Sequence, residues 1–273
     1  VTHINPHLDD IAAIWLFKKF HPEFKNAKLE FVSASRDLAA KEENKDKTSL
    51  LPNKVFVGTG GGEFDEHKEG LDTCAGTLVY EYLKKEKYIP ENEIARRALD
   101  RLTEWNLLID TGKAPDCQFN EFSVQAFIRS RDNSQQTSGK SVELGIEILE
   151  RALVVLKRRQ QSLKDWENRV EFQSKFGKSF AVVSETVDRE FCKEQAGNLF
   201  LMYHPKHKGV QFFTPSFDID LEPIYAKLKS LDPEATWFLH QSHHMVICGS
   251  SSALDSKPTK LSFGQLIEVA KEL

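Results

Sequence analysis

The sequence predicts an α/β fold, with an N-terminal domain built on a mainly parallel sheet, a long connecting helix and a smaller α+β C-terminal domain. Short apolar strands alternate with helical patterns in the first half of the chain, which is typical of strand–helix–strand units. The pattern then changes to one long helical periodicity followed by closely spaced strands. We therefore expect domains over residues 1–135 and 179–273, with a linker and connecting helix over 136–178.

Predicted strands and helices alternate along the first half of the chain. Apolar runs predict strands around residues 1–4, 29–32 and 54–58, and apolar residues at helical spacing predict helices over about 9–20, 73–84 and 91–108. Asp9 and Asp10 stand at the beginning of the first helix, where acidic side chains suit the helix dipole.

The second half begins with a polar segment from Asp132 to Gly139, which we expect to be a loop. A helical pattern without proline then predicts one helix from Ser141 to about Phe176. Beyond it, alternating residues predict strands at 180–183, 199–203, 210–213, 237–239 and 245–248, and helices at 221–231 and 262–273.

Charge and cysteine usage narrow the class of protein. The 37 basic and 41 acidic side chains give the 273-residue chain a net charge of −4, which argues against a polybasic nucleic-acid binder but allows a local basic groove. The longest apolar run, Ile11 to Phe17, is far shorter than the roughly 18 residues of a membrane span. The four cysteines form no CxxC pair, so we expect reduced thiols, a cytoplasmic location and no membrane partner.

The first candidate site is a cluster of His3, His7, Asp9 and Asp10 within eight residues, at a strand end and a helix start. Imidazole and carboxylate together suit Mn²⁺, Fe²⁺ or Zn²⁺ better than Ca²⁺. In a strand–turn–helix unit these side chains would face the crevice at the carboxyl ends of the strands, where open α/β sheets bind ligands. The alternative is that the two aspartates cap the helix and the histidines lie on the surface.

The second candidate site follows the third strand. A triple glycine at residues 60–62 would let the backbone approach a ligand closely, and Asp65, Glu66 and His67 come directly after it. A glycine-rich hairpin with a charged tip is the alternative. We expect His3, His7 and Asp9 to converge with Asp65 and His67 because both segments follow apolar strands.

Further candidates would bind an anionic substrate. Arg36 follows the second strand and its guanidinium could fork onto a phosphate, or it could be a surface ion-pair residue. In the C-terminal domain, His240, Ser242 and His243 follow an apolar strand, either as substrate contacts or as a polar hairpin.

Taken in order, these segments resemble the DHH phosphoesterase superfamily, nearest to its branch named for a melanocyte-proliferation gene, which contains a 3′-to-5′ RNA exonuclease. The segment from Thr2 to Asp10 looks like that branch's Thr-His … His-x-Asp-Glu/Asp, and Ser33 to Asp37 is similar to its Arg-Thr-Arg-Asp. Residues 63–67 look like its Tyr/Phe-Asp-His-His signature, residues 73–80 are similar to the helix that follows, and residues 237–242 look like its Val-Phe-Val-His-Ala-Ser.

The resemblance implies a metal-dependent phosphodiester hydrolase, a 3′-to-5′ exonuclease or an oligonucleotide or nucleotide phosphodiesterase, whose partner is its nucleic-acid or nucleotide substrate. It implies divalent metal, Mn²⁺ foremost and Mg²⁺ or Zn²⁺ otherwise, with catalytic roles for Asp9, Asp65 and His67. The residues that it implies as metal ligands are His3, His7, Asp9, Asp65, Glu66 and Asp100, with Asp110 as the less favoured choice for the last.

Two positions depart from the family pattern. Gly58 stands where the family has a metal-bridging aspartate, and Glu66 replaces the middle histidine of the signature. These departures favour an alternative, a member of the same fold that binds a nucleotide or RNA end without cutting it. A second alternative is a zinc-dependent N-deacetylase, because residues 6–10 also resemble the Pro-His-Pro-Asp-Asp of that class. Those deacetylases have a later His-x-x-His ligand segment, and no histidine pair has that spacing in the middle of this chain.

Overall fold

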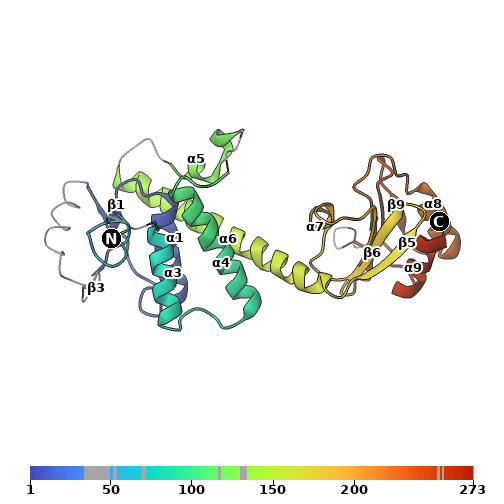
Figure 1. The fold of residues 1–273 in the computed structure, drawn as a ribbon, viewed down its shortest axis with the longest axis horizontal. Helices are drawn as coiled ribbons and strands as arrows, with labels where there is room; N and C mark the ends of the chain where they lie inside the picture. Colours follow the sequence, from blue (N-terminus) through green and yellow to red (C-terminus); the bar gives the residue numbers. More distant parts are fainter. Residues whose placement is uncertain are drawn as a thin grey trace. The chain divides into compact units, whose positions relative to one another are not determined.

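The computed structural model describes residues 1–33, 50–51, 54–68, 72–115, 118–129, 134–250, 253 and 255–272 (Figure 1). Arg36 lies outside these residues. The chain forms two compact units, Val1–Lys157 and Arg158–Leu273. Helix α6 (Gln135–Trp166) begins in unit 1 and ends in unit 2, so the unit boundary falls inside a helix.

Unit 1 is built around α1 (Leu8–Phe20), which is buried on all sides from Leu8 to Phe17. Helices α3 (Ala75–Lys85) and α4 (Glu93–Asp110) pack against α1 and against each other (Figure 1). Burial from every side explains why α1 is apolar all round and has no polar face. The 3₁₀ turn η1 (Asn120–Phe122) and α5 (Val124–Ile128) precede α6.

The strands of unit 1 are short. Strand β1 (Thr2–His3) pairs in parallel with β2 (Phe31–Val32), and β3 (Leu50–Leu51) pairs in antiparallel with β4 (Lys54–Val55). After β4, the Val57 amide donates a hydrogen bond to the Val1 carbonyl at 3.0 Å. This bond lays the glycine-rich loop of residues 58–67 beside β1 and the beginning of α1, which positions the candidate site.

Unit 2 contains a six-stranded mixed sheet with the strand order β5-β6-β7-β8-β10-β9, in which only β6 and β7 run parallel. Its strands are β5 (Val170–Ser174), β6 (Gly177–Val183), β7 (Leu199–His204), β8 (Gly209–Phe213), β9 (Trp237–Leu239) and β10 (Met245–Cys248). Helices α8 (Glu222–Leu231) and α9 (Phe263–Glu272) cover one face, and α7 (Arg189–Lys193) with the end of α6 covers the other. Residues along β7 alternate between these two cores, as the pleat requires.

The mixture of helices and strands that the sequence predicts is confirmed, and β9 and β10 have the predicted bounds. The predicted end of the long helix is wrong. Helix α6 ends at Trp166 rather than Phe176, because residues 170–174 form β5 in a hairpin with β6. Gly177 has φ +97° at this turn, a conformation that glycine adopts without a steric penalty. The predicted loop to Gly139 is also too long, since α6 begins at Gln135.

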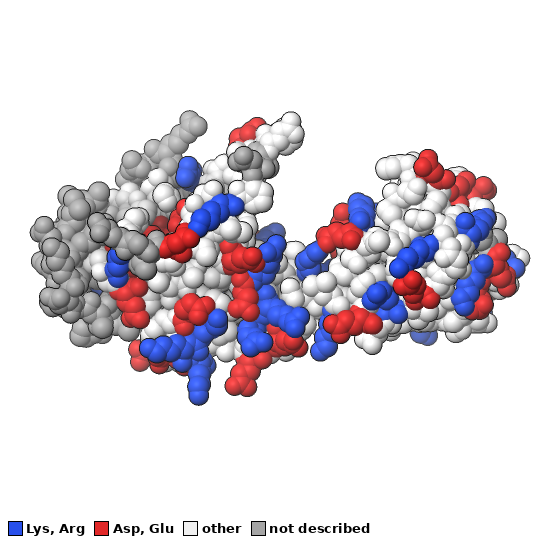
Figure 2. Space-filling view, in the orientation of Figure 1, with Lys and Arg blue, Asp and Glu red and all other residues white. Residues whose placement is uncertain are grey.

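Basic and acidic side chains are interspersed on the face shown in Figure 2, without a continuous basic stripe over the described residues. Cys74, Cys192 and Cys248 are buried free thiols, and Cys117 lies outside the described residues. None of the helices described is both long and apolar enough to cross a membrane.

Candidate metal centre

Two groups of metal-ligand side chains form in unit 1. His7, Asp9 and Asp110 make the first, and Asp65, Glu66 and His67 make the second; within each group the ligand atoms lie within 4.8 Å of one another. The first group comes from the start of α1 and the end of α4, and the second from the glycine-rich loop. Charges act between the groups, since Glu66 raises the pKa of Asp9 and His67 lowers the pKa of Asp110.

Asp9 has an unusual environment for a carboxylate. Its side chain is buried, and its Oδ2 atom has no hydrogen-bond partner among the described residues. Burial raises the pKa of Asp9 well above its ordinary value, and the charges of Asp10, Asp110 and Glu66 raise it further. A buried, unpartnered carboxylate oxygen is costly unless a proton or a cation compensates it.

Glu66, in the second group, also has a buried carboxylate oxygen and a raised pKa. Its Oε2 atom is buried without a hydrogen-bond partner in the described part of the chain. Burial raises the pKa of Glu66 to about 7, and the charges of Asp10 and Asp65 act in the same direction against a backbone hydrogen bond and His67. Asp9 Oδ2 and Glu66 Oε2 are thus orphaned, that is, buried without a hydrogen-bond partner among the described residues. The two residues are coupled electrostatically.

His7 and Asp110 complete the first group. Burial lowers the pKa of His7, with smaller contributions from His3 and Arg129, so its imidazole is neutral at neutral pH, the form that binds metals. Burial and then the charge of Asp10 raise the pKa of Asp110. Asp110 is the last residue of α4, where the negative end of the helix dipole also disfavours an acidic side chain. That unfavourable position is a sequence signal that identifies Asp110 as a candidate functional residue.

Asp100, which the resemblance favours as a ligand over Asp110, lies in neither ligand group, whereas Asp110 lies in the first. The two residues are ten positions apart on α4, which is about 15 Å along a helix. The carboxylate of Asp100 accepts a hydrogen bond from the Tyr80 hydroxyl at 2.8 Å, and its side chain is exposed.

Asp10 and His3 form an ion pair beside the two groups. Asp10 Oδ2 accepts hydrogen bonds from His3 Nε2 at 2.9 Å and from the His7 amide at 2.8 Å. His3 Nδ1 donates to the Ile4 carbonyl at 2.9 Å, so both ring nitrogens are donors and the imidazole is charged. Burial would lower the pKa of His3, but the hydrogen bond and charge of Asp10 outweigh it and raise the pKa to about 9. In this structure His3 therefore orients Asp10 and is a member of neither ligand group.

Asp10 also occupies the space above Gly58. Gly58 has φ +61°, and a Cβ atom built on it would lie 1.7 Å from Asp10 Oδ1. No side chain fits at position 58 while Asp10 keeps this rotamer. The Asp10 carboxylate, which α1 carries, fills the space above this point of the loop.

Asp65 holds the glycine-rich loop in shape. Its carboxylate is completely buried, with Oδ2 accepting from the Gly61 amide at 2.6 Å and Oδ1 accepting from the His67 amide at 3.0 Å. His67 Nδ1 also donates to Oδ1 at 3.0 Å, which fixes the tautomer and places the lone pair on Nε2. The His67 side chain is 58% exposed, so the ring reaches solvent.

The candidates of the C-terminal domain all lie in unit 2. His240 and Ser242 line a cavity of about 390 Å³, but His243 does not. His243 Nδ1 donates to Asp220 Oδ1 at 3.0 Å, and His244 lines the cavity instead.

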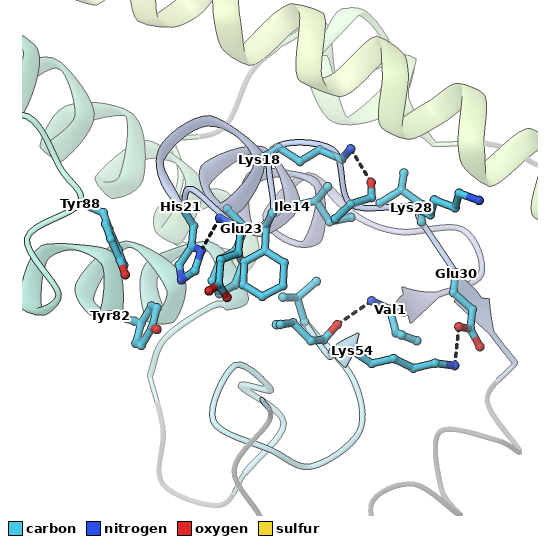
Figure 3. A pocket seen from close by; sticks show the side chains of 16 residues that line it. Val1, Ile14, Lys18, His21, Glu23, Lys28, Glu30, Lys54, Tyr82 and Tyr88 are labelled. Atoms are coloured by element: carbon cyan, nitrogen blue, oxygen red, sulfur yellow. Dashed lines mark hydrogen bonds and ion pairs between the residues drawn. The ribbon is translucent and has the colours of Figure 1, made fainter. Parts of the chain in front are cut away.

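A larger cavity of unit 1 does not contain the candidate ligands. It measures about 970 Å³ and is lined by aromatic residues such as Tyr82 and Tyr88 and by lysines such as Lys18, Lys28 and Lys54 (Figure 3). None of the residues in the two ligand groups lines it. The two candidate ligand groups therefore lie outside the lining of this large cavity.

The donor set of the two groups fits a divalent ion. Carboxylate oxygens and imidazole nitrogens suit Mn²⁺, Mg²⁺ or Zn²⁺, and the orphaned oxygens of Asp9 and Glu66 are the atoms that such an ion would compensate. No protein-family model and no curated protein matches the chain.

Proposed function

We propose that this protein is a metal-dependent phosphodiester hydrolase that acts on oligonucleotides or nucleotides. The observation that carries the proposal is the pair of orphaned buried carboxylate oxygens, on Asp9 and Glu66, in two electrostatically coupled groups of acidic and imidazole side chains. Such a cluster is destabilising by itself and is stabilised by bound cations. The resemblance to DHH phosphoesterases supports the phosphodiester bond as the one that is cleaved.

His7, Asp9 and Asp110 would hold one ion, and Glu66 would hold or share a second. A divalent ion supplies Lewis-acid polarisation of a phosphoryl oxygen. The chain itself supplies the neutral imidazole of His7 and the His3–Asp10 ion pair at the start of α1. Arg129, whose charge is felt by His7, offers a guanidinium to a phosphate.

His67 has the geometry of a general base. Asp65 orients its ring, as the carboxylate of a catalytic triad orients histidine, and leaves the Nε2 lone pair to accept a proton. Water attacks the phosphorus atom, its proton passes to His67 Nε2, and the bond from phosphorus to the leaving nucleoside oxygen breaks. The exposed His67 ring then returns the proton to solvent or to the leaving oxygen.

An assay on 5′-labelled RNA and DNA oligomers with added Mn²⁺, Mg²⁺ or Zn²⁺ tests this proposal. We expect shortening from the 3′ end with at least one ion and no cleavage in chelator. Asp9→Asn should weaken metal binding in calorimetry at least about tenfold, the size of effect seen when a supporting residue of a metal site is lost. Asp100→Asn is the matched control and should keep wild-type affinity. Wild-type affinity in Asp9→Asn, or no cleavage with any ion, would overturn the proposal.

Gly58 favours a second candidate, a non-catalytic nucleotide- or RNA-binding protein. Position 58 carries no carboxylate, and Asp10, which fills its space, is already engaged by His3 and the His7 amide. Retained affinity for RNA without metal binding or cleavage would support this candidate. The zinc deacetylase has less support, because Asp10 would be its general base and that carboxylate is buried in hydrogen bonds.

A further inference from the structure

The cavity of unit 2 has an unusual charge. Its lining includes Arg189 and Lys193 from α7 and His240 and His244 from the β9–β10 turn, but no acidic residue. Acidic residues outnumber basic ones in the chain, 41 to 37. Arg189 is exposed and has no ion-pair partner among the residues described, and Lys193 pairs only with the exposed Glu190 at 2.8 Å. A cavity with these side chains favours an anion.

An aromatic ring stands at the same cavity. Phe217 is 88% exposed, the most exposed large apolar side chain of the described residues, and it lines the cavity. The Phe217 and His244 rings pack in an edge-to-face arrangement, with ring centroids 5.0 Å apart and ring planes at 79°. This contact orients Phe217 while most of the ring remains accessible for stacking.

The β9–β10 turn presents the histidines to the cavity. His243 has a left-handed backbone, φ 57°, and its side chain turns to Asp220. A left-handed conformation is uncommon for a residue other than glycine. His240 is held by Ser242, with 2.8 Å between Nδ1 and Oγ, and His240, Ser242 and His244 all line the cavity.

We propose that this cavity binds a nucleotide, with the base stacked on Phe217 and the phosphate on Arg189 and Lys193. The imidazoles and the Ser242 hydroxyl would supply the polar contacts around the sugar and phosphate. Stacking on an exposed aromatic ring beside cationic side chains is how single-stranded nucleic acids are bound without base readout. The volume of about 390 Å³ lies within the range of small-ligand sites, about 300–1,000 Å³. Whether the bound nucleotide is also cleaved rests on the proposed function. The binding itself concerns unit 2 alone.

Binding to the whole 273-residue chain in chelator tests the inference without turnover. Calorimetry with AMP and anisotropy of a labelled single-stranded pentanucleotide should both show binding, whereas adenosine and inorganic phosphate should each bind more weakly than AMP. Phe217→Ala should weaken AMP binding about tenfold or more, and Phe217→Tyr should retain it. Because Phe217 is almost fully exposed, its replacement should leave the melting temperature unchanged.

Two controls make the test specific. Phe122→Ala removes a ring that is 68% exposed in unit 1 and should change nothing. Arg189→Ala should weaken AMP and phosphate but not adenosine, and should reduce the salt dependence of pentanucleotide binding by about 0.7 in log–log slope. Equal effects of Phe217→Ala and Phe122→Ala, or no AMP binding by the wild-type protein, would overturn the inference. A pentanucleotide that binds where AMP does not would place recognition in the strand and overturn the single-nucleotide site.

The outcome is separable from that of the proposed function. Asp9→Asn should keep wild-type affinity for AMP in chelator while losing metal binding. If the cavity does not bind nucleotides, AMP should not bind although metal-dependent cleavage is observed. If the protein is not a hydrolase, AMP should bind although no cleavage is observed.

Discussion

Asp9 and Asp10 are adjacent in sequence but have opposite environments. Successive residues of a helix point about 100° apart, so the start of α1 aims Asp9 at the ligand group and Asp10 at the protein. Asp10 is satisfied by hydrogen bonds to His3 and to the His7 amide, whereas one oxygen of Asp9 has no partner. In the proposed metal centre, Asp9 would therefore be a ligand, and Asp10 would hold its neighbours in position.

The contact between Asp10 and Gly58 is testable by substitution. Gly58→Ala should destabilise the protein more than Gly112→Ala, by about 1–3 kcal/mol, the cost of overpacking. Both glycines have positive φ, +61° and +68°, so the backbone penalty is shared. Only Gly58 faces a clash, since a Cβ at Gly112 meets nothing within 4 Å. Urea unfolding measures both losses, and equal losses would contradict the contact.

The raised pKa of Glu66 predicts that the stability of the metal-free protein depends on pH. Its pKa is about 7 in the folded state, against an ordinary value of 4.5. The folded state therefore retains the proton, and this stabilisation is complete below pH 4.5 and is lost as the pH rises through 7. Between pH 5 and pH 8 in chelator, the wild-type protein should lose about 2–3 kcal/mol of unfolding free energy relative to Glu66→Gln. Parallel pH profiles for the two proteins would rule out this role for Glu66.

At the scale of elements, α1 and α6 are joined by a partly buried hydrogen bond. The indole Nε1 of Trp15 donates to Glu150 Oε1 at 2.7 Å, and Lys19 donates to the same carboxylate. Burial would raise the pKa of Glu150, but the hydrogen bonds from Lys19 and Trp15 lower it. The Trp15 side chain is buried, so its N–H depends on Glu150 for an acceptor.

Glu150→Ala should therefore destabilise the protein by about 1–3 kcal/mol, the cost of a buried donor left unsatisfied. Glu150→Gln keeps an acceptor for Trp15 and should lose less. Glu147→Ala is the matched control on the same helix, because Glu147 makes only an exposed pair with Arg151, and it should change stability by less than about 1 kcal/mol. Chemical unfolding followed by tryptophan fluorescence compares the three variants; similar losses for Glu150→Ala and Glu147→Ala would contradict the buried bond.

Elements with a strong local pattern could be predicted from the sequence, and others could not. Strands β9 and β10 were predictable because short apolar runs flanked by polar residues are typical of strands. Strand β5 was missed because Val170 and Phe172 continue the apolar spacing of α6, and only pairing with β6 makes them a strand. Local periodicity carries no information about such a partner.

The same limit applies to the candidate site. The sequence indicates His7, Asp9 and the 65–67 segment by residue type and spacing, but it places Asp100 above Asp110. Which end of α4 meets the start of α1 depends on helix packing, and both aspartates lie on one helix. The burial of Asp9 and Glu66, which distinguishes a ligand site from a capped helix, is likewise a property of the fold.

At the scale of the whole molecule, the two units have separate hydrophobic cores. The core of unit 1 surrounds α1, whereas the cores of unit 2 lie on the two faces of its sheet. Both ligand groups belong to unit 1 and the basic cavity belongs to unit 2. Metal and nucleotide should therefore stabilise different parts of the chain.

Hydrogen exchange measured with and without Mn²⁺ tests this division. A ligand at 100 times its Kd stabilises the state that binds it by about 2.7 kcal/mol, which slows exchange through opening of that region about 100-fold. We expect this added protection in α1, in the 58–67 loop and at the end of α4, since these segments carry the ligands. Amides of β7 and β8 should exchange at the same rate with and without the ion, and AMP should reverse the pattern. Asp9→Asn should abolish the effect of Mn²⁺ and leave that of AMP. Protection by Mn²⁺ that is equal in both units, or confined to unit 2, would place the ion away from Asp9 and remove the basis for a metal centre in unit 1.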